Sequence, residues 1–263
     1  MIERSTLTTV LVRALVLVII AMASATPTLI AQRIPSAHGF QQTYPGAIAI
    51  GLSAGPNFNV GMSGPRATCD CEFDGGTGIG SHAGLHLDVH LNRWFGLRLQ
   101  GLYEDYSSVY ESDFAVAVFD ETGATADATA RRRADVSLHY VGISFQSVWF
   151  TGPAGMYLLA GAGVGFFAGG TLRDEEFITT PGFVYPSTGT STQLYEDGDL
   201  DQGRDPVRRA SLIVGVGYSV PLARGIAIAP ELQFDYPLTS VIEGNADWSI
   251  PTIRTSVGLR FGL

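Results

Sequence analysis

The last fourteen residues of the chain, 250–263, alternate between two kinds of side chain. One row is apolar and includes Ile253, Val257, Leu259, Phe261 and Leu263, whereas the row between is arginine, serine and glycine. Successive strand residues point to opposite faces, so this segment is expected to have one lipid-like face and one hydrophilic face. A sheet in hydrocarbon cannot leave an unpaired edge, so it must close on itself. The pattern therefore predicts the closing strand of an outer-membrane β-barrel.

The beginning of the chain has the composition of an export signal. Glu3, Arg4 and Arg13 precede an apolar run over 14–22, and small residues follow at 23–25. This order predicts a secretory signal peptide at 1–25, with cleavage after Ala25; cleavage after Ala31 is the alternative. A retained membrane helix is disfavoured because the apolar run is shorter than the ~18 residues a span needs. The expected division is a signal peptide at 1–25, an N-terminal periplasmic segment at 26–45 and a barrel at 46–263.

The remaining composition restricts the compartment and the partners. The 16 basic residues face 25 acidic ones, which gives a net charge of -9 and disfavours nucleic acid as a partner. Beyond the signal, no stretch reaches ~18 consecutive apolar residues, so an exported chain of membrane character must cross with strands. We therefore expect the outer membrane of a Gram-negative-type bacterium, with its lipid as a direct partner.

Eight segments have a period of two, which predicts an all-β fold: a closed, eight-stranded, antiparallel, up-and-down transmembrane β-barrel. Three connections are tight, whereas those at 58–80, 107–135, 170–207 and 239–249 are long and rich in Gly, Asp, Ser and Thr. Short turns on one side and long loops on the other are typical of outer-membrane barrels, whose long loops face outside. The eight expected strands are 46–57, 81–91, 95–106, 136–150, 156–169, 208–221, 226–238 and 250–263.

Aromatic residues fall near the expected strand ends, where two girdles would meet the membrane interfaces. The turn-side girdle would contain Trp94, Phe95, Trp149, Phe150 and Phe261. The loop-side girdle would contain Tyr103, Tyr106, Tyr110, Phe166, Phe167, Tyr236 and Trp248.

The inner face of the barrel is predicted to hold paired charges. If residues 92–94 form a turn, the flanking strands place Asp88 opposite Arg98, His86 opposite Gln100 and His82 opposite Glu104. An eight-stranded barrel is just wide enough for side chains to fill it, so a plugged, charge-paired lumen is the favoured interpretation and a narrow ion channel the alternative. The predicted luminal network consists of Asp88, Arg98, His82, Glu104, Glu231, Asp235, Arg254 and Arg260.

Two loop motifs suggest further chemistry. Cys69 and Cys71 lie in the first long connection, and in an oxidising compartment they could form a local disulfide or pair between molecules. Asp197, Asp199 and Asp201 alternate as in a calcium loop, but the glycine and the last ligand of such a loop are misplaced. We therefore favour a loop disulfide and a solvated acidic loop, with a weak calcium site as the alternative. No resident metal or other cofactor is expected.

Two histidine patterns are candidates for metal binding or catalysis. His82, His86 and His90 share a strand face, but positions four apart are separated by ~13 Å, too far for one ion. Ser137 and His139 also share a face, but no acid can be assigned to them from the sequence. We therefore expect structural histidines and no catalytic residues.

Three strands carry a family resemblance: the glycine-alternating segments 157–165 and 214–218, and the ending 257–263. They resemble the OmpA-like and PorT-type outer-membrane β-barrel families over essentially the whole chain from about Gly46. The resemblance implies insertion by the barrel-assembly machinery, with Phe261 and Leu263 as the terminal signal, and it transfers no catalytic residue. It leaves a structural or surface-interaction role through the long loops, with an unknown extracellular or periplasmic protein partner. A PorT-type accessory of a secretion or assembly machine is the alternative, and a lipid-modifying enzyme comes third.

Overall fold

The computed structural model describes residues 48–65, 73, 75–119, 125–151, 155–185, 188–200, 208–241 and 248–263, and every regular element in these ranges is a β-strand. The predicted signal peptide and the segment at 26–45 lie outside the described residues. Within the described ranges, no helix is long and apolar enough to span a membrane.

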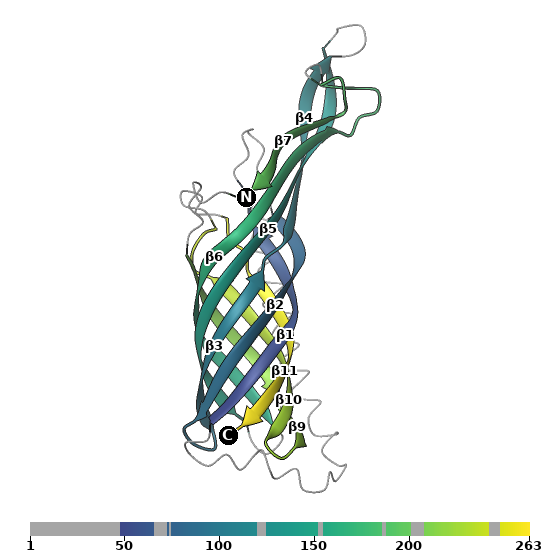
Figure 1. Ribbon diagram of the computed structural model, residues 1–263. Helices are drawn as coiled ribbons and strands as arrows, with labels where there is room; N and C mark the ends of the chain where they lie inside the picture. Colours follow the sequence, from purple (N-terminus) through teal and green to yellow (C-terminus); the bar gives the residue numbers. More distant parts are fainter. Residues whose placement is uncertain are drawn as a thin grey trace. The chain divides into compact units, whose positions relative to one another are not determined.

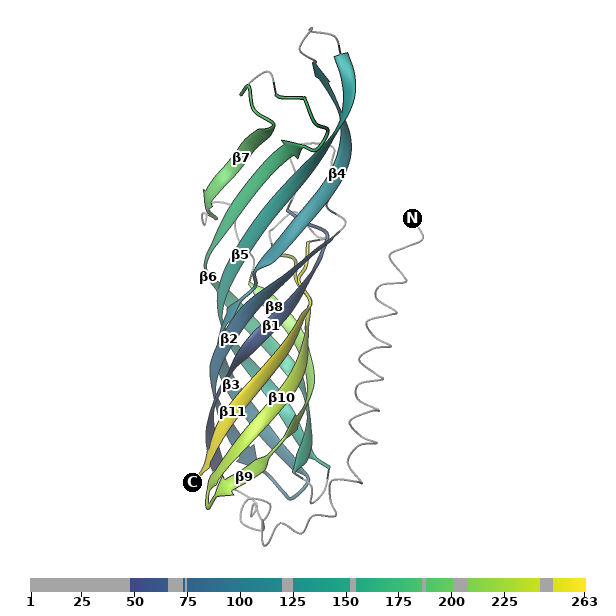
Figure 2. The same ribbon diagram turned by 90° about the vertical axis from the view of Figure 1, so that its right-hand side faces the viewer.

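Eight strands form a closed ring in which every neighbour is antiparallel (Figures 1 and 2). The predicted fold class is therefore confirmed. A short strand, β9 (Val220–Ala223), continues β8 along β10. In ring order the strands are β1 (Ile48–Met62), β2 (Gly75–His90), β3 (Phe95–Asp105), β5 (Thr125–Phe150), β6 (Met156–Ile178), β8 (Arg209–Tyr218), β10 (Ile226–Pro237) and β11 (Thr252–Gly262), which pairs with β1.

The ring has an apolar exterior and a polar interior. Leu85 and Ile143 are 59% and 58% exposed on the outside, whereas Arg98 is fully buried inside. On β5 the outward apolar residues run from Val141 to Trp149, nine positions, and a tilted membrane strand needs about nine to eleven. The ring is therefore the membrane-spanning part of the chain.

The hairpin of β2 and β3 has the predicted register. Asp88 pairs with Arg98 and His82 with Glu104. At the turn, the side-chain oxygen of Asn92 accepts hydrogen bonds from the backbone N–H groups of Trp94 (2.8 Å) and Phe95 (2.9 Å). Because the turn fixes which residues face each other, it also fixes which side chains enter the lumen.

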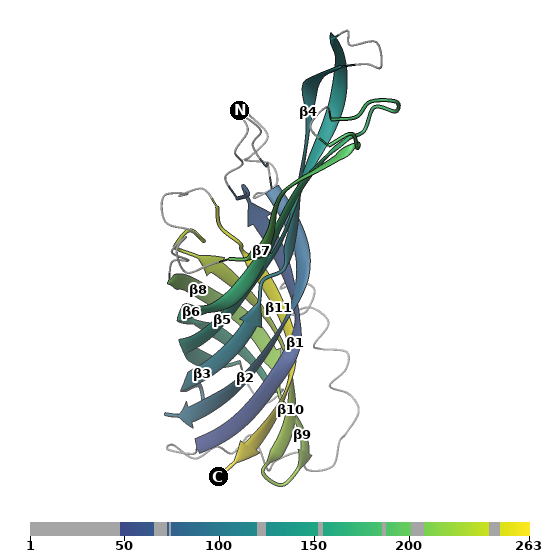
Figure 3. The ribbon, with the colours of Figure 1, turned by 45° about the horizontal axis from the view of Figure 1, so that its top comes forward.

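Two of the predicted long loops are in fact strands. β4 (Ser108–Phe119) begins two residues after the end of β3. It pairs with the outer part of β5 and continues the register of the β3–β5 pair. β7 (Thr192–Asp199) pairs with the outer part of β6. The prediction of loops was therefore wrong at 108–119, 125–135, 171–178 and 192–199, and the predicted loop at 58–80 is likewise strand at 58–62 and 75–80. Residues 108–119, 125–136, 171–178 and 192–199 extend β5 and β6 beyond the ring (Figures 1 and 3). We call them the extracellular sheet, after the expectation that the long connections of such a barrel face outside the cell.

A β-bulge marks the point where β6 leaves the ring. Tyr140 pairs with Phe167 and His139 with Gly169, so Ala168 is the additional residue. The bulge moves the inward-facing positions of β6 from odd numbers, such as Tyr157, to even numbers. An inward–outward alternation with a constant phase ends at this bulge. The sequence pattern therefore predicted that the strand ends at 169.

The aromatic prediction was partly right. Half of the twelve proposed girdle residues are substantially exposed on the outside of the ring, namely Trp94, Trp149, Phe261, Tyr103, Phe166 and Tyr236. Tyr106, Tyr110 and Trp248 are instead almost completely buried and belong to an apolar cluster inside the loop-side end of the barrel. Their assignment to the girdle was wrong because position near a strand end does not determine which face a side chain occupies.

Candidate functional site: a filled lumen and an extracellular sheet

The turn-side half of the lumen contains a cluster built around two carboxylates, which we call the turn-side cluster (Asp88, Arg98, Tyr157, Glu231 and Arg260). Asp88 accepts two hydrogen bonds from Arg98, at 2.7 and 3.1 Å. One oxygen of Glu231 accepts from Arg98 (2.8 Å), Arg260 (2.8 Å) and the Tyr157 hydroxyl (2.6 Å). The five residues come from five strands of the ring, β2, β3, β6, β10 and β11, so the cluster ties opposite walls together.

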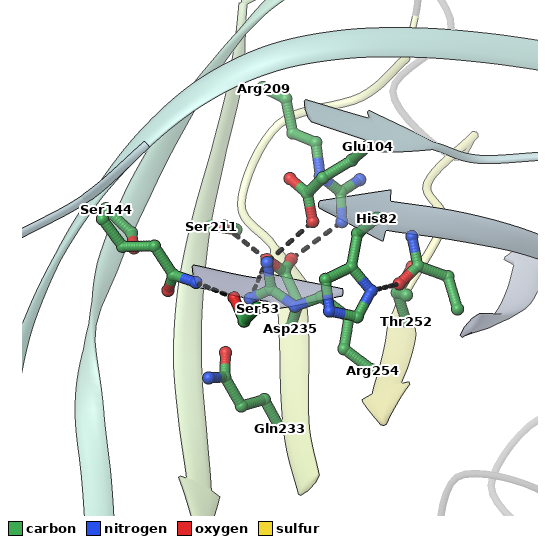
Figure 4. Close-up of polar contacts among 12 residues, drawn as sticks. Ser53, His82, Glu104, Ser144, Arg209, Ser211, Gln233, Asp235, Thr252 and Arg254 are labelled. Carbon is green, nitrogen blue, oxygen red and sulfur yellow. Dashed lines mark hydrogen bonds and ion pairs between the residues drawn. The ribbon is translucent and has the colours of Figure 1, made fainter. Parts of the chain in front are cut away.

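The loop-side half contains a second cluster, which we call the loop-side cluster (Glu104, Arg209, Asp235 and Arg254; Figure 4). Asp235 accepts from Arg209 at 2.8 Å and from Arg254 at 3.1 Å. Arg254 also donates to Glu104 at 2.7 Å, so this guanidinium bridges β3 and β10. The two clusters together contain four carboxylates and four arginines, all buried, so their formal charges balance. That balance compensates for the desolvation that burial imposes on each charge.

The structure places all eight predicted luminal residues inside the ring, but their partners differ in one case. His82 lies opposite Glu104 in the ladder, yet its Nδ1 is hydrogen-bonded to Asn57 at 2.7 Å, while Glu104 pairs with Arg254. Cross-strand position alone did not identify these contacts because long arginines reach across the lumen.

Two contributors were not identified from the sequence. Arg209 occupies the inward row of β8 together with Ser211 and Ile213, and the parity of that row was a usable signal. Tyr157 occupies the inward row of β6, and a Cβ on the facing Gly217 would lie 2.2 Å from its ring. The glycine in β8 therefore provides the space for this tyrosine.

Apolar side chains close both ends of the lumen. At the loop side, the indole Nε1 of Trp248 donates to the Tyr110 hydroxyl at 2.9 Å within the buried cluster that also contains Tyr106 and Tyr140. At the turn side, Val148, Leu159 and the ring of Tyr157 form a smaller cluster. Between the two, a cavity lined by residues such as Glu104, Ser144 and Arg209 has a volume of about 10 Å³, about the size of one water molecule.

The extracellular sheet has a buried face stabilised by polar contacts. Arg132 forms a bidentate pair with Asp174 and lies 4.7 Å over the Tyr195 ring. Glu176 accepts from the hydroxyls of Tyr185 (2.6 Å) and Tyr195 (3.0 Å). Burial, followed by the hydrogen bond to Glu176, raises the pKa of Tyr185 well above its ordinary value. These contacts hold the segment around Tyr185 against the sheet.

The opposite face of the extracellular sheet carries exposed ion pairs. Arg131 donates to Asp113 at 2.6 and 3.0 Å and lies 3.7 Å from Glu111. The hydrogen bond from Arg131 lowers the pKa of the Asp113 carboxyl. Similar pairs join Arg133 to Asp135 and Arg173 to Glu175. Exposed pairs of this kind contribute little stability but keep this face of the sheet polar.

The remaining candidate sites have mixed outcomes. Cys69 and Cys71 lie outside the described residues, as does Asp201. Asp197 and Asp199 belong to β7, opposite Arg173 and Thr171, so the expectation of an acidic loop at these two positions was wrong. An extended strand does not wrap around an ion, and within the described residues no group of three or more potential metal ligands is found.

An acid does lie beside Ser137 and His139. Asp105 is 3.9 Å from His139 Nδ1 and accepts hydrogen bonds from Ser107 (2.8 Å) and Ser137 (3.4 Å), on the outer face at the loop-side end of the apolar belt. The Tyr103 ring stacks on His139. In a hydrolytic triad the histidine base is hydrogen-bonded to the serine nucleophile. Here the Ser137 hydroxyl donates to the Asp105 carboxylate instead, so these three residues do not have the triad arrangement.

A closed antiparallel ring with an apolar outer belt and a polar, filled interior defines a small transmembrane β-barrel of the kind found in bacterial outer membranes. The chain is therefore a small transmembrane β-barrel.

Comparison with solved structures finds low similarity to three bacterial proteins. Ail, the attachment invasion locus protein of Yersinia pestis, is 14% identical, with 83% of this chain and 100% of that chain covered and a TM-score of 0.35. Neisserial surface protein A is 12% identical over 81% of this chain and 97% of that chain, with a TM-score of 0.36. The N-terminal β-barrel domain of Pseudomonas aeruginosa OprF is 12% identical, with 82% of this chain and 97% of that chain covered and a TM-score of 0.36. No protein-family profile and no curated protein sequence matches the chain.

Proposed function

We propose that this chain is a non-conducting outer-membrane barrel that presents the extracellular sheet as an interaction surface for a partner outside the cell. The observation that carries the proposal is the length of β5: 26 residues, of which sixteen, Thr125 to Tyr140, lie beyond the apolar belt. At ~3.3 Å per residue these span ~50 Å along the strand. A barrel that served only as a membrane plug would not need such a paired extension.

The contents of the lumen support the non-conducting part. An ion path needs a continuous wet passage, but here both ends are closed by apolar side chains, and the two charge clusters between them are internally paired. Opening a path would break buried arginine–carboxylate pairs, each costly to separate. A resting pore is therefore disfavoured.

Insertion would use the features expected from the sequence. We propose export by the N-terminal signal and recognition of Phe261 and Leu263 by the barrel-assembly machinery. Both side chains are exposed on the outside of the ring, at 39% and 81%. This exposure makes them accessible to another protein or to lipid.

The proposal can be tested by recording currents across planar bilayers that contain the purified protein. Its control is a truncated variant in which an Asn-Gly turn replaces 112–132, joining Glu111 to Arg133, and a second one replaces 174–196, joining Arg173 to Asp197. These junctions keep Tyr110 and Leu172 of the loop-side apolar cluster. Both junctions are existing cross-strand pairs, so the barrel should still fold. We expect heat-modifiable migration in gels and no stepwise current from either protein. Stepwise currents through the full chain that the truncation alters would show that the extracellular sheet is a gate, and would overturn the proposal.

A further inference from the structure

We infer that the outer surface of the ring has a lipid-binding site at Asp105 and His139, and that its occupant is a lipid whose headgroup carries a primary ammonium group. The inference goes beyond the proposed function, because the site lies on the ring and not on the extracellular sheet.

Four polar residues meet where the outward faces of β3 and β5 leave the apolar belt. Asp105 pairs with His139 across the two strands, and the preceding outward residue on β3, Tyr103, is 48% exposed toward lipid. Asp105 Oδ1 accepts hydrogen bonds from the hydroxyls of Ser107 (2.8 Å) and Ser137 (3.4 Å) and lies 3.9 Å from His139 Nδ1. Asp105 Oδ2 accepts no hydrogen bond from the part of the chain that the structure describes. The site therefore lies at the level of the lipid headgroups and has a free carboxylate oxygen.

The charge of Asp105 is not balanced by an arginine. Four acids further out on β4, β5 and β6 each lie beside one, namely Glu111, Asp113, Asp135 and Glu175. Among the described residues, the one ion-pair partner of Asp105 is His139, which is charged only when protonated. The Asp105 side chain is 23% exposed, whereas that of Asp113 is 53% exposed. A half-buried carboxylate beside hydrocarbon favours a cation as its partner.

The hydrogen-bonding groups of the site select the kind of cation. An ionised carboxylate only accepts hydrogen bonds, and the two serine hydroxyls already donate to Asp105. The imidazole of His139 stacks on the Tyr103 ring, with centroids 6.0 Å apart and planes 12° apart, so it forms a fixed wall beside the carboxylate. A ligand must therefore supply N–H donors. A primary ammonium group has three of them, whereas a quaternary ammonium group has the same charge and none.

The apolar belt next to the site has a gap that an acyl chain can fill. Gly101 is the outward residue two positions before Tyr103, and a Cβ there would have no heavy atom within 4 Å. Its cross-strand neighbours, Leu85 and Ile143, project into lipid and are 59% and 58% exposed. Asp105 lies four residues, or ~13 Å, further along β3. A lipid can thus place a chain between Leu85 and Ile143 and its headgroup at Asp105, which a free amine cannot do.

The test is native mass spectrometry of the full chain in detergent, titrated with phosphatidylethanolamine or with phosphatidylcholine that carries the same acyl chains. The two headgroups have the same net charge, so a difference in affinity reports the N–H donors of the ammonium group. We expect the wild type to retain one molecule of the ethanolamine lipid with an affinity at least about fivefold higher, because only this headgroup can donate to the carboxylate.

Three variants separate the parts of the site, each checked for folding by heat-modifiable migration. Asp105→Asn should lower the preference for the ethanolamine lipid below about twofold, because it removes the charge that accepts the ammonium group. Asp135→Asn is the matched control: it lies on the same outward face, but Arg133 already pairs with it, so the preference should not change. Gly101→Leu should weaken both lipids by a similar factor and leave the preference intact, because its side chain fills the gap.

A second probe does not depend on how the variants fold. The affinity of the wild type should fall with each N-methyl group added to the ethanolamine lipid, because each one replaces an N–H donor. Soluble glycerophosphoethanolamine at the same concentration should not displace the lipid, and displacement by it would overturn the assignment of a lipid.

Equal retention of the two lipids by the wild type, or a preference unchanged by Asp105→Asn, would overturn the inference and leave the proposed surface role intact. The truncated variant keeps Asp105, Ser107, Ser137 and His139 and should show the wild-type preference. The inference and the proposed function can therefore fail independently.

Discussion

Glu231 should be the most sensitive acidic position in the barrel. Its carboxylate accepts hydrogen bonds from Arg98, Arg260, Tyr157 and Gln233, all between 2.6 and 2.8 Å. Glu231→Gln keeps the shape but removes the charge, so the turn-side cluster would contain two arginines and a single acid. Removing one partner of a buried pair typically costs about 3–5 kcal/mol, and the retained amide oxygen places the expected loss near ~3 kcal/mol.

The loss can be measured as the free energy of unfolding in urea, with the protein folded into phospholipid vesicles and monitored by tryptophan fluorescence. The slope of the transition should not change, because the surface exposed on unfolding is the same. Glu111→Gln is the control, since Glu111 is exposed and 3.7 Å from Arg131, and a surface pair of this kind contributes about 0–1 kcal/mol. The double variant Glu231→Gln/Arg260→Met restores equal numbers of charges, so it should lose less than the sum of its single variants by about 2 kcal/mol. A single Glu231→Gln variant within about 1 kcal/mol of wild type would refute the charge-balance argument.

Two further predictions concern the packing of the lumen and the extracellular sheet. Gly217→Ala should destabilise the barrel by about 1–3 kcal/mol in the same unfolding assay, because its new Cβ would collide with the Tyr157 ring. Gly101→Ala, which has open space at its Cβ, should be neutral or slightly stabilising. Equal effects of the two substitutions would contradict the contact assigned to Gly217. In an absorbance titration corrected with Tyr185→Phe, Tyr185 should ionise well above the ordinary tyrosine pKa of about 10, because burial and the hydrogen bond to Glu176 raise its pKa. The stability it contributes is fully present below pH ~10 and is lost as pH rises through the folded-state pKa, so titration of Tyr185 together with exposed tyrosines would show that it is not held against the sheet.

The membrane-spanning ring could be predicted because each of its strands has a lipid-facing and a lumen-facing side. Lipid on one side and a polar lumen on the other impose strict alternation, and the Asn92 turn then fixes the register that brings Asp88 to Arg98. Arg209 could have been found in the same way from the inward row of β8. The contacts of His82 could not, because they depend on which long side chains cross the lumen.

The extracellular sheet could not be recognised because both of its faces are outside lipid, so the alternation weakens. The Arg131–Arg133 run reads as a solvated loop, although Arg132 is buried against Asp174 while its two neighbours are exposed or half-buried. On β6 the bulge at Ala168 shifts the phase of the pattern. The burial of Tyr106 and Trp248 inside the barrel depends on packing among distant strands, which local position does not determine.

The central claim is that one ring spans the membrane, with its tight turns on the periplasmic side and the extracellular sheet outside the cell. Its most direct test is labelling of single cysteines on intact cells with a membrane-impermeant thiol reagent, in a Cys69→Ser/Cys71→Ser background. Asp113→Cys should react because it lies on the exposed face of the extracellular sheet; Ile143→Cys in the apolar belt and Asn92→Cys in the β2–β3 turn should react only after the cells are broken or the protein is unfolded. Labelling of Asn92→Cys on intact cells, or protection of Asp113→Cys there, would contradict the account.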